Sequence, residues 1–311
     1  MTDVAATTGA RAPLVYATVL YWQPVEVPLV ERCVESLVAQ EPGGAAAQLR
    51  VLVLDNGCGA TPSLPPRCRV SSELVRLPTH LGFTGGHNAG MRRALDDGAD
   101  YVFLVNSDVV ADRTCLSELL RVAEADPRVG IVGPLVLREA EPDRVESAGQ
   151  SFDRRTGRHR ELGRGMDRGR VGLEPRQVDA VSGCALLAKR DVLTSIGLLD
   201  DRLFCYFEDM DWCLRASRQG FGVAVAPRAR VWHRGGGSTG PAAPRTTFYS
   251  VRNHLVVAGR YARRPVGRLV YPLVLAYHLA FLARSRDRRS PSHVRALVCA
   301  AWSALRGRLS A

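Results

Sequence analysis

The N-terminal part of the chain alternates continuous apolar runs with a segment of helical periodicity. Leu14–Leu20 is a continuous apolar run, as expected for a strand that is buried on both faces of a sheet. Valine and leucine then recur at helical spacing as far as Val38, with Pro28 suited to a first helical turn, and Leu49–Leu54 is a second buried run. Strand, helix and strand in this order predict a parallel sheet with right-handed crossovers. Ligands bind beyond the carboxyl ends of such strands, and Asp55 stands at one of these ends.

Segments of the same two kinds continue along the chain, so the predicted fold class is α/β with a mostly parallel central sheet. The first half adds a weaker strand at Val70–Leu77, a glycine-rich loop at His80–Gly90 with a helix after it to about Asp97, the clearest strand at Tyr101–Val105, a helix at Thr114–Ala125 and a strand at Val129–Val136. Ala140–Pro175 is polar, rich in Arg and Gly and poor in periodicity, and we interpret it as a long, partly mobile surface excursion. The second half adds a strand at Val178–Ala188, a helix at Arg190–Ile196, short strands at Gly222–Ala226 and Val231–His233, and a flexible loop at Gly235–Ser238.

The stretch Phe204–Arg215 places three carboxylates among aromatic side chains. Glu208, Asp209 and Asp211 are so close that they repel one another unless a cation, a proton or a helix N-terminus takes up the charge. Apolar residues recur at helical spacing after the acids, so we expect them on the first turn of a short helix that Gly220 ends. Such a place can raise the pKa of a carboxylate and let it act as a base. The alternative is an acidic first turn that serves only the helix dipole.

Charge and cysteine content narrow the class of protein only in part. The chain has 42 Lys and Arg against 31 Asp and Glu, and much of the excess lies in Arg154–Arg176 and Arg260–Arg308. This local basic charge alone leaves nucleic acid, anionic membranes and phosphorylated substrates open as partners. The 8 cysteines form no C-x-x-C pair and no His cluster has zinc spacing, so reduced thiols of a cytosolic protein are the simplest interpretation. Met1–Pro13 lacks the pattern of a signal peptide.

The C-terminal part, which begins at a soft boundary near Arg264, is apolar with basic edges. Leu269–Ala283 is the longest apolar run, but it is shorter than the roughly 20 residues that a membrane-spanning helix needs. In His293–Leu309, apolar residues recur at helical spacing among arginines. Two interpretations stay open, namely a helix pair packed on the preceding domain and an interfacial helix that lies on an anionic membrane.

Three polar residues at strand ends are candidates for ligand binding. Asp108 follows the clearest strand beside a hydroxyl, which suits a hard divalent cation, although a helix-capping role is the alternative. His233 ends a short strand and is either a metal ligand or a structural histidine. Asp55 either accepts a hydrogen bond from a nucleobase or makes a turn with Gly57. The glycines of Gly82–Gly90 could bring backbone N–H groups to a phosphate, but they fit neither the P-loop nor the dinucleotide-binding pattern.

A set of short motifs occurs in a fixed order over about residues 14–262. The motifs are Leu54-Asp55-Asn56, Leu81-Gly82-Phe83-x-Gly85-Gly86-x-Asn88-x-Gly90, Asn106-Ser107-Asp108, Gly183 before Lys189-Arg190, Ile196–Asp200, Phe204–Arg215, Val231-Trp232-His233 and Arg252-Asn253. In this order they closely resemble the family 2 glycosyltransferases, in particular the branch that includes bacterial rhamnosyltransferases.

The resemblance implies a GT-A fold, which is Rossmann-like, a nucleotide-sugar donor and a divalent metal, Mg²⁺ or Mn²⁺. In the family, the acid that matches Asp55 holds the nucleotide base. The residues that match Asp108 and His233 bind the metal, and the acid that matches Asp209 is the catalytic base of an inverting displacement. We further expect Glu208 and Asp211 to accompany Asp209 in catalysis, and Tyr206 and Trp212 to stack on the acceptor, with core packing as the alternative for Trp212. The expected donor-binding residues are Tyr21, Asp55, Gly82, Phe83, Gly86, Asn88, Asn106 and Ser107.

The sequence therefore predicts a cytoplasmic, metal-dependent inverting glycosyltransferase that uses a dTDP- or UDP-sugar, with rhamnose favoured by the resemblance. The acceptor is a hydroxyl group of a glycan, a lipid-linked glycan or a small natural product. Peripheral contact with the anionic inner face of a membrane and a homodimer stay open, and no nucleic-acid partner is expected. The expected catalytic domain spans residues 1–263, with a donor half at about 14–137 and an acceptor half at about 178–263, and residues 264–311 form a C-terminal helical segment.

Two residues near the expected donor site depart from the family pattern. Residue 80 is His80 where the family usually has Asn, and residue 22 is Trp22 where the first strand usually ends in Tyr-Asn. The identity of the donor is therefore less well defined by the sequence than the family.

Two other classes of protein are weighed against the glycosyltransferase. An anionic-surface binding protein with a degenerate nucleotide-sugar site should have lost Asp108, Asp209 or His233, and all three are present. A nucleotidyltransferase would need a glycine-rich, basic phosphate loop directly after the first strand, and Leu20–Val27 has neither glycine nor a basic residue.

Overall fold

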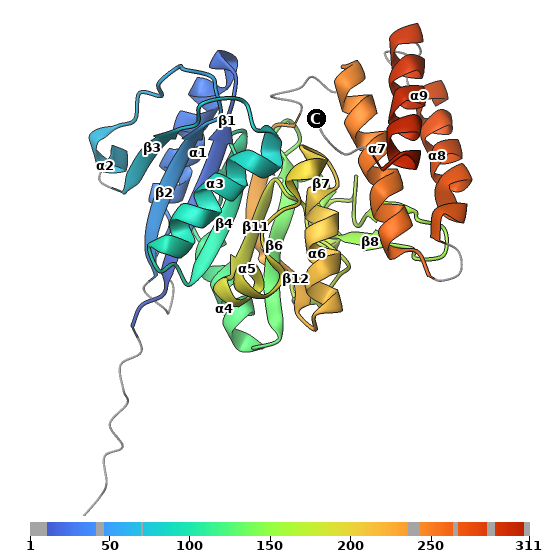
Figure 1. The fold of residues 1–311 in the computed structure, drawn as a ribbon. Coiled ribbons are helices and arrows are strands. Elements are labelled where there is room, and N and C mark those ends of the chain that lie inside the picture. Colours follow the sequence, from blue (N-terminus) through green and yellow to red (C-terminus); the bar gives the residue numbers. More distant parts are fainter. Residues whose placement is uncertain are drawn as a thin grey trace, which may run out of the picture.

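The computed structural model describes residues 11–41, 47–69, 71–235, 243–263, 267–284 and 290–307 (Figure 1). The expected loop at Gly235–Ser238, apart from Gly235, lies outside these ranges, as does the expected domain boundary near Arg264. The division of the chain into two domains therefore stays a prediction.

A central sheet organises the fold, with strand order β10-β12-β6-β11-β4-β1-β2-β3, in which β10 is the two-residue strand Arg176–Gln177. Strands β1 (Leu14–Tyr21), β2 (Gln48–Asp55), β3 (Ser72–Arg76) and β4 (Tyr101–Asn106) pair in parallel, which confirms the predicted pairing. Tyr21 is in register with Asp55, and Leu20 with Asn106, so the carboxyl ends of β1, β2 and β4 are level. Strand β11 (Ala185–Lys189) runs antiparallel between β4 and β6 (Val129–Arg138), and β12 (Gly222–His233) continues parallel to β6.

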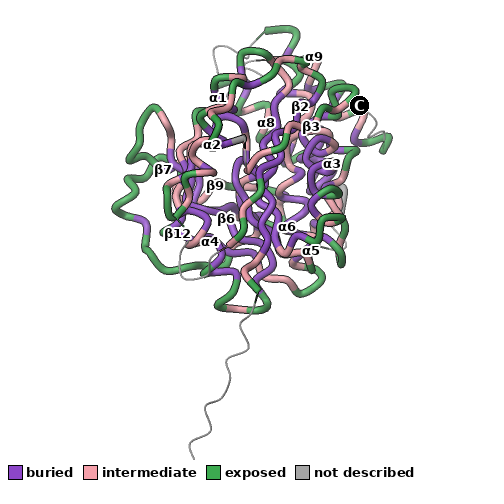
Figure 2. The backbone as a smooth tube through the Cα atoms, turned by 90° about the vertical axis from the view of Figure 1, so that its left-hand side faces the viewer, coloured by how far each residue is buried: buried purple, intermediate pink, exposed green. Residues whose placement is uncertain are grey.

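Alternating side chains of the strands build a separate buried core on each face of the sheet. Val15, Ala17 and Val19 of β1 contribute to the core under α1 (Val27–Val38) and α4 (Cys115–Ala125). Tyr16 and Leu20 point the other way, into the core under α3 (Gly82–Asp96), α5 (Arg190–Ile196) and α6 (Glu208–Arg218). Figure 2 shows the resulting column of buried backbone through the middle of the molecule. Burial on both faces explains why these strands are apolar without interruption.

Three C-terminal helices stand beside the sheet, next to α6 (Figure 1). They are α7 (Pro244–Tyr261), α8 (Tyr271–Arg284) and α9 (Pro291–Leu305), and both α8 and α9 pack on α7. Leu297, Ala300 and Ala304 are the buried face of α9, which confirms that these helices pack on the preceding domain. Packing does not cover the opposite faces, because Leu273, Leu279, Val298 and Trp302 are each more than half exposed.

The stretch Ala140–Pro175 is not the mobile excursion that its composition predicts. It contains short strands β7 (Val145–Ser147), β8 (Gln150–Phe152) and β9 (His159–Glu161) and a 3-10 turn at Arg168–Arg170. Its buried residues include Val145, Ala148 and Phe152. Strands of three residues are too short to show an alternating pattern, so the sequence concealed them.

Three other element predictions also differ from the structure. The strand expected at Val178–Ala188 is confined to Ala185–Lys189, which is β11. Helix α3 begins at Gly82, so Gly82–Gly90 is the first part of the helix and not a loop before it. Glycine is needed there for close packing, because a Cβ at Gly86 would lie 2.5 Å from Leu20 Cδ1. The two short strands expected at Gly222–Ala226 and Val231–His233 are one strand, β12, with a bulge between them.

Candidate active site

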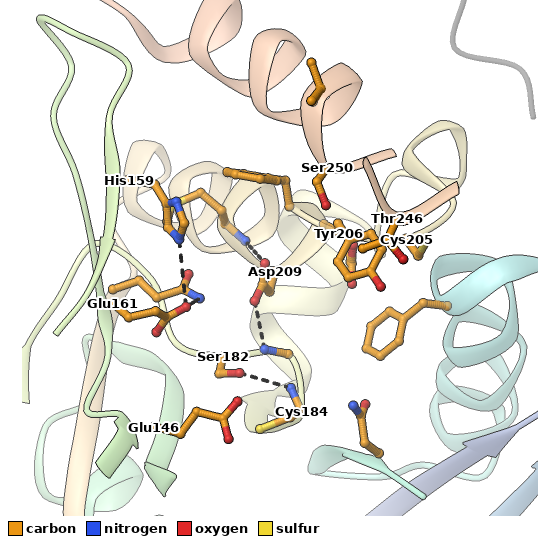
Figure 3. A pocket seen from close by; sticks show the side chains of 18 of the residues that line it. Glu146, His159, Glu161, Ser182, Cys184, Cys205, Tyr206, Asp209, Thr246 and Ser250 are labelled. Atoms are coloured by element: carbon orange, nitrogen blue, oxygen red, sulfur yellow. Dashed lines mark hydrogen bonds and ion pairs between the residues drawn. The ribbon is translucent and has the colours of Figure 1, made fainter. Parts of the chain in front are cut away.

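A cavity of about 800 Å³ opens at the carboxyl edge of the sheet (Figure 3). Its walls come from the ends of β4 and β12, the β8–β9 hairpin, the turn before α6, and helices α7 and α8. Among the residues expected from the sequence to be functional, those that line the cavity are Phe83, Asn106, Asp108, Tyr206, Glu208, Asp209 and His233. The structure therefore brings the expected metal-binding and catalytic residues to one place.

Asp108 and His233, which are far apart in the sequence, meet at one side of this cavity. Strand β5 (Val109–Ala111) pairs with the end of β12 and sets Val109 opposite His233, so the preceding Asp108 is brought beside the imidazole. His233 Nε2 lies 3.3 Å from Asp108 Oδ1, and Nδ1 lies 3.1 Å from Glu146 Oε1. Burial lowers the pKa of His233, but Cys184 and the two carboxylates raise it well above its usual value.

The side chains of Asp108 and His233 fit a shared divalent cation. Ligand atoms about 2.1 Å from a metal and at right angles to each other are about 3 Å apart, close to the separation of the two side chains. Glu146 would then hold the outer nitrogen of His233, as carboxylates commonly do for metal-binding histidines. No group of three or more His, Cys, Asp or Glu side chains in the described ranges is arranged to hold a metal. A cation here would therefore also need oxygens of a ligand.

The acidic residues at the start of α6 do not share one environment. Asp209 Oδ2 accepts a hydrogen bond from Gly183 N at 2.9 Å, and Oδ1 accepts one from Met210 N at 2.7 Å. A Cβ at Gly183 would lie 3.2 Å from Asp209 Cβ, so glycine lets the backbone approach the carboxylate closely. Burial raises the pKa of Asp209, and burial together with the charge of Asp209 raises the pKa of Glu208 well above its usual value. Asp209 therefore has the environment of a general base.

Asp211 does not belong with this pair, which corrects the expectation that it accompanies Asp209 in catalysis. It is almost fully buried, away from the residues that line the cavity. Arg215 Nε donates to Oδ2 at 2.9 Å, Arg260 NH1 donates to Oδ1 at 2.8 Å, and Tyr261 also donates to Oδ1. These contacts join α6 to α7, so Asp211 holds the two helices together.

The side chain of Trp212 likewise does not reach the cavity. Its side chain is 0% exposed, and its Nε1 donates to Gly197 O at 2.9 Å, so the core-packing alternative is confirmed and the expected stacking on an acceptor is wrong. Tyr206, in contrast, lines the cavity, and its role in acceptor binding stays a prediction.

The turn before α6 has an unusual backbone that explains the Arg252-Asn253 motif. Phe204, Tyr206 and Phe207 have φ values of 65°, 70° and 66°, the left-handed region that residues other than glycine rarely adopt. Asn253 Nδ2 lies 2.8 Å from the carbonyl oxygens of residues 203, 205 and 206. Arg252 NH2 donates to the carbonyl oxygens of residues 202 and 203. Two buried side chains of α7 therefore hold the turn that positions Asp209.

Several expected donor-binding residues are structural in the unliganded chain. Tyr21 is buried and donates its hydroxyl to Ala60 O, and Asn88 bonds both backbone groups of Leu199 across the core. Gly82 and Gly86 pack against neighbouring side chains, and Ser107 is buried. Their assignment to donor binding stays a prediction.

Asp55 makes a turn, but with the two residues after Gly57 and not with Gly57 itself, which was the expected alternative to base binding. Its Oδ1 accepts from the backbone N–H groups of Cys58 and Gly59, and its Oδ2 accepts from Arg76 at 2.8 Å. This arrangement fixes the loop after β2 at the level of the strand ends. Contact between Asp55 and a nucleobase stays a prediction, and it would compete with these partners.

The two departures from the family pattern are in contact with each other. The rings of Trp22 and His80 are stacked at 5.3 Å, and Phe204 meets His80 edge to face at the same distance. These rings line a smaller cavity of about 150 Å³ next to the first. Both were expected near the donor site, but their direct contact was not predicted.

Further cavity residues were missed in the sequence. They lie in the stretch interpreted as a surface excursion and in the irregular chain before β11, and they include Glu146, Gln150, His159, Glu161, Ser182 and Cys184. The first four lie in a segment without periodicity, so no pattern distinguished them from loop residues. Ser182 and Cys184 lie where the sequence predicts a strand, and nothing there marked them as cavity residues.

Solved structures of glycosyltransferases share this arrangement of sheet and helices. A mannosyltransferase from Pyrobaculum calidifontis, solved with GDP-Man and Mn²⁺, aligns with a TM-score of 0.55 at 17% identity, over 94% of this chain and 87% of its own. S. aureus TarS, solved with UDP-GlcNAc, aligns with a TM-score of 0.56 at 13% identity, over 95% of this chain and 82% of its own. Likeness at these identities shows the fold alone, and it places the chain in the GT-A class of α/β proteins.

Residues 13–255 match the family described as glycosyltransferase like family 2; the chain belongs to this family and is a glycosyltransferase. The N-acetylglucosaminyl-diphospho-decaprenol L-rhamnosyltransferase of Mycobacterium tuberculosis is 30% identical over 264 residues, which are 77% of this chain and 85% of that protein. A galactofuranosyltransferase of Mycolicibacterium smegmatis is 24% identical over 272 residues, which are 79% of this chain and 42% of that protein. These likenesses confirm the fold class, the family and the enzyme class predicted from the motifs.

Among the described residues, no helix is both long enough and apolar enough to cross a bilayer.

Proposed function

We propose that this glycosyltransferase moves a rhamnose-like sugar, with inversion, from a dTDP- or UDP-sugar to a hydroxyl group of a lipid-linked glycan. One observation carries the proposal, namely that a single cavity joins the Asp108–His233 pair to the buried carboxylate of Asp209. Glycosyl transfer needs a neutralised diphosphate and a base for the attacking hydroxyl, and these groups supply both. The donor sugar and the lipid-linked acceptor are inferred from the mycobacterial relative.

In the proposed reaction, Asp209 accepts the proton of the acceptor hydroxyl. The oxygen of that hydroxyl group at the same time bonds to the anomeric carbon of the donor. The bond from that carbon to the diphosphate oxygen breaks on the opposite face, and its electron pair leaves with the nucleoside diphosphate. A divalent cation held by Asp108 and His233 would neutralise charge on the leaving diphosphate. Burial and the charge of Asp209 raise the pKa of Glu208, which disfavours a second negative charge beside the base.

A donor panel tests this proposal without knowledge of the acceptor. The full chain is incubated with dTDP- and UDP-sugars and Mn²⁺ or Mg²⁺, and release of nucleoside diphosphate is measured. We expect hydrolysis to be fastest with dTDP-L-rhamnose and to stop with EDTA. Equal hydrolysis in EDTA would refute the metal dependence, and failure to bind or hydrolyse any donor would refute the whole proposal.

The second part of the proposal concerns the outer faces of α8 and α9. A lipid-linked acceptor lies at a membrane, so the enzyme needs a surface that contacts the membrane. Phe281 and Leu282 of α8 line the cavity, while Leu279, Val298 and Trp302 leave apolar area exposed outside it. The segment around these helices is rich in arginine, which complements anionic headgroups. We therefore propose that these faces lie on the anionic cytoplasmic leaflet and bring the cavity to the acceptor.

Vesicle binding tests the membrane contact. Because α9 shares the core with α7, point substitutions are preferable to truncation. We expect the full chain to co-sediment with anionic vesicles, less so at high salt because exposed charges are screened. The double variant Val298→Asp, Trp302→Asp should lose about 10-fold or more of this binding and keep donor hydrolysis, whereas Leu173→Asp, an exposed apolar residue elsewhere, should keep both. Equal vesicle binding by both variants would contradict the contact.

A further inference from the structure

Unpaired polar atoms are concentrated in one wall of the large cavity. Within the described ranges, seven buried side-chain nitrogen or oxygen atoms have no hydrogen-bond partner. Four of them belong to residues that line this cavity, and they are Gln150 Oε1, His159 Nδ1, Glu161 Oε2 and Glu208 Oε2. Buried polar groups are nearly always paired, so a group of unpaired ones at a cavity indicates a missing ligand.

The β8–β9 hairpin sets three of these residues side by side. Gln150 and Glu161 are directly opposite in the ladder, and Gln150 Nε2 donates to Glu161 Oε1 at 2.8 Å. His159 Nε2 lies 3.8 Å from the same carboxylate (Figure 3). Burial raises the pKa of Glu161, but the contact with His159 and other neighbours lowers it further, so the carboxylate is ionised at neutral pH.

These contacts decide whether the remaining polar atoms can donate or accept hydrogen bonds from a ligand. The amide of Gln150 must turn its nitrogen to the carboxylate, so its oxygen remains free as an acceptor. The second oxygen of Glu161 is also an acceptor, and so is His159 Nδ1 when the ring proton is on the nitrogen that faces the carboxylate. A wall of acceptors with a negative charge attracts hydroxyl donors and repels phosphate or carboxylate. Small rotations of the terminal torsions would present these atoms to a ligand.

We propose that Gln150, His159 and Glu161 form a subsite that binds the hydroxyl groups of a sugar ring. The inference rests on the proposed function and adds a location for sugar recognition on the hairpin. The ring could come from the donor or from the acceptor, since both carry free hydroxyl groups, and the test separates these sources.

Two variants remove the hydroxyl-binding groups with little change in size. Glu161→Gln removes the charge, and Gln150→Met removes the free amide oxygen. Arg160→Gln is the matched control, because Arg160 is on the same strand as Glu161 but faces away from the large cavity and is exposed. Calorimetry measures binding of the sugar nucleotide and of the bare nucleoside diphosphate, and kinetics measure the KM of donor hydrolysis and of the acceptor.

If the ring belongs to the donor, both variants should weaken sugar-nucleotide binding about 10- to 100-fold and leave the bare diphosphate unchanged. If it belongs to the acceptor, donor binding and hydrolysis should be unchanged, and the acceptor KM in transfer should rise by a similar factor. In both cases Glu161→Gln should keep the thermal midpoint, because its amide oxygen can still accept the hydrogen bond from Gln150. Gln150→Met loses that hydrogen bond and should lower the midpoint slightly, and the control should match the wild type.

Unchanged sugar-nucleotide affinity and acceptor KM in both variants would overturn the subsite while the wild type stays active. An equal loss of bare diphosphate binding, or a lowered thermal midpoint in Glu161→Gln, would instead show that the hairpin is structural. Failure of the wild type to bind any sugar nucleotide would refute the proposed function itself, and the subsite with it.

Discussion

Two aspartates on the first turn of α6 have the same chemistry and opposite surroundings. Asp209 faces the cavity, and burial raises its pKa with no ion pair to an Arg or Lys within the described ranges. Asp211 is buried between Arg215, Arg260 and Tyr261, so its charge is fully compensated. The two residues are neighbours in sequence, yet one carboxylate is available to react and the other is committed to structure.

The difference shows that burial alone does not identify a catalytic carboxylate. Both aspartates are largely removed from water, and only the partners of their oxygens distinguish them. Backbone N–H groups hold Asp209 without neutralising it, whereas guanidinium groups neutralise Asp211. A base needs the first arrangement, because in the second the guanidinium groups already occupy the oxygens and compensate the charge that would attract a proton.

The largest effect that would test this comparison is on turnover. Asp209→Asn removes the proton acceptor and keeps the size of the side chain, so we expect turnover to fall by about 10²–10⁴ with donor affinity nearly unchanged. Steady-state kinetics and calorimetry with the donor measure the two quantities. The assignment fails if Asp209→Asn keeps most activity while Glu208→Gln or Asp211→Asn abolishes it.

Asp211→Ala should act on stability instead. It leaves the guanidinium groups of Arg215 and Arg260 without their shared partner in a mostly buried place, and we expect a loss of about 3 kcal/mol in the free energy of unfolding. Denaturant titration measures this loss. The double variant Asp211→Leu, Arg260→Met should lose less free energy of unfolding than Asp211→Ala. A greater loss would show that the Asp211–Arg260 ion pair is not the main source of the effect.

Asp108 is an intermediate case between Asp209 and Asp211. Its direct contact with His233 can be replaced by a metal ion that both side chains bind. Asp108→Ala and His233→Ala should each weaken metal-dependent binding of nucleoside diphosphate about 10- to 100-fold and leave the fold intact. Glu146→Gln should weaken it less, because Glu146 contacts only the outer nitrogen. Calorimetry with and without EDTA measures the binding, and metal-independent binding of full strength in the intact protein would rule out the site.

The smallest effect is the pH dependence of stability that Glu208 produces. The pKa of Glu208 is raised in the folded protein. Its favourable contribution to folding stability is therefore complete below the ordinary pKa of 4.5 and is lost as the pH rises through the pKa of the folded state. Glu208→Gln cannot ionise and avoids this loss. We expect the thermal midpoint of the variant to approach that of the wild type at low pH and to exceed it progressively as the pH rises. A constant difference across pH would show that Glu208 does not titrate in this range.

The parallel half of the fold could be predicted because its sequence signals are local. Buried strands such as Leu14–Tyr21 are continuous apolar runs, and the motif order gave the family and the residues at the strand ends. The pairing of Asp108 with His233 was also expected, although only from the resemblance. The sheet supplies its physical cause, which is the contact between β5 and β12.

The rest could not be predicted because it depends on contacts between distant segments. The local signal that distinguishes Asp211 from Asp209 is Arg215, four residues further on the same helix, while Arg260 and Tyr261 lie about fifty positions away. The hairpin with Gln150 and Glu161 is made of strands too short for a periodic signal. The glycines of Gly82–Gly90 indicated a loop whose backbone could approach a phosphate. The structure uses one of them, Gly86, for close packing of α3 on Leu20.

The left-handed turn at residues 204–207 has a mechanical consequence. A backbone in this conformation relaxes when its restraints are removed, and the restraints come from Arg252 and Asn253 on α7. Asp209 follows this turn, so its position depends on α7 as well as on its hydrogen bonds from Gly183 N and Met210 N. Helices α8 and α9 pack on the same α7, so a displacement of their outer faces would act on the start of α6 through α7.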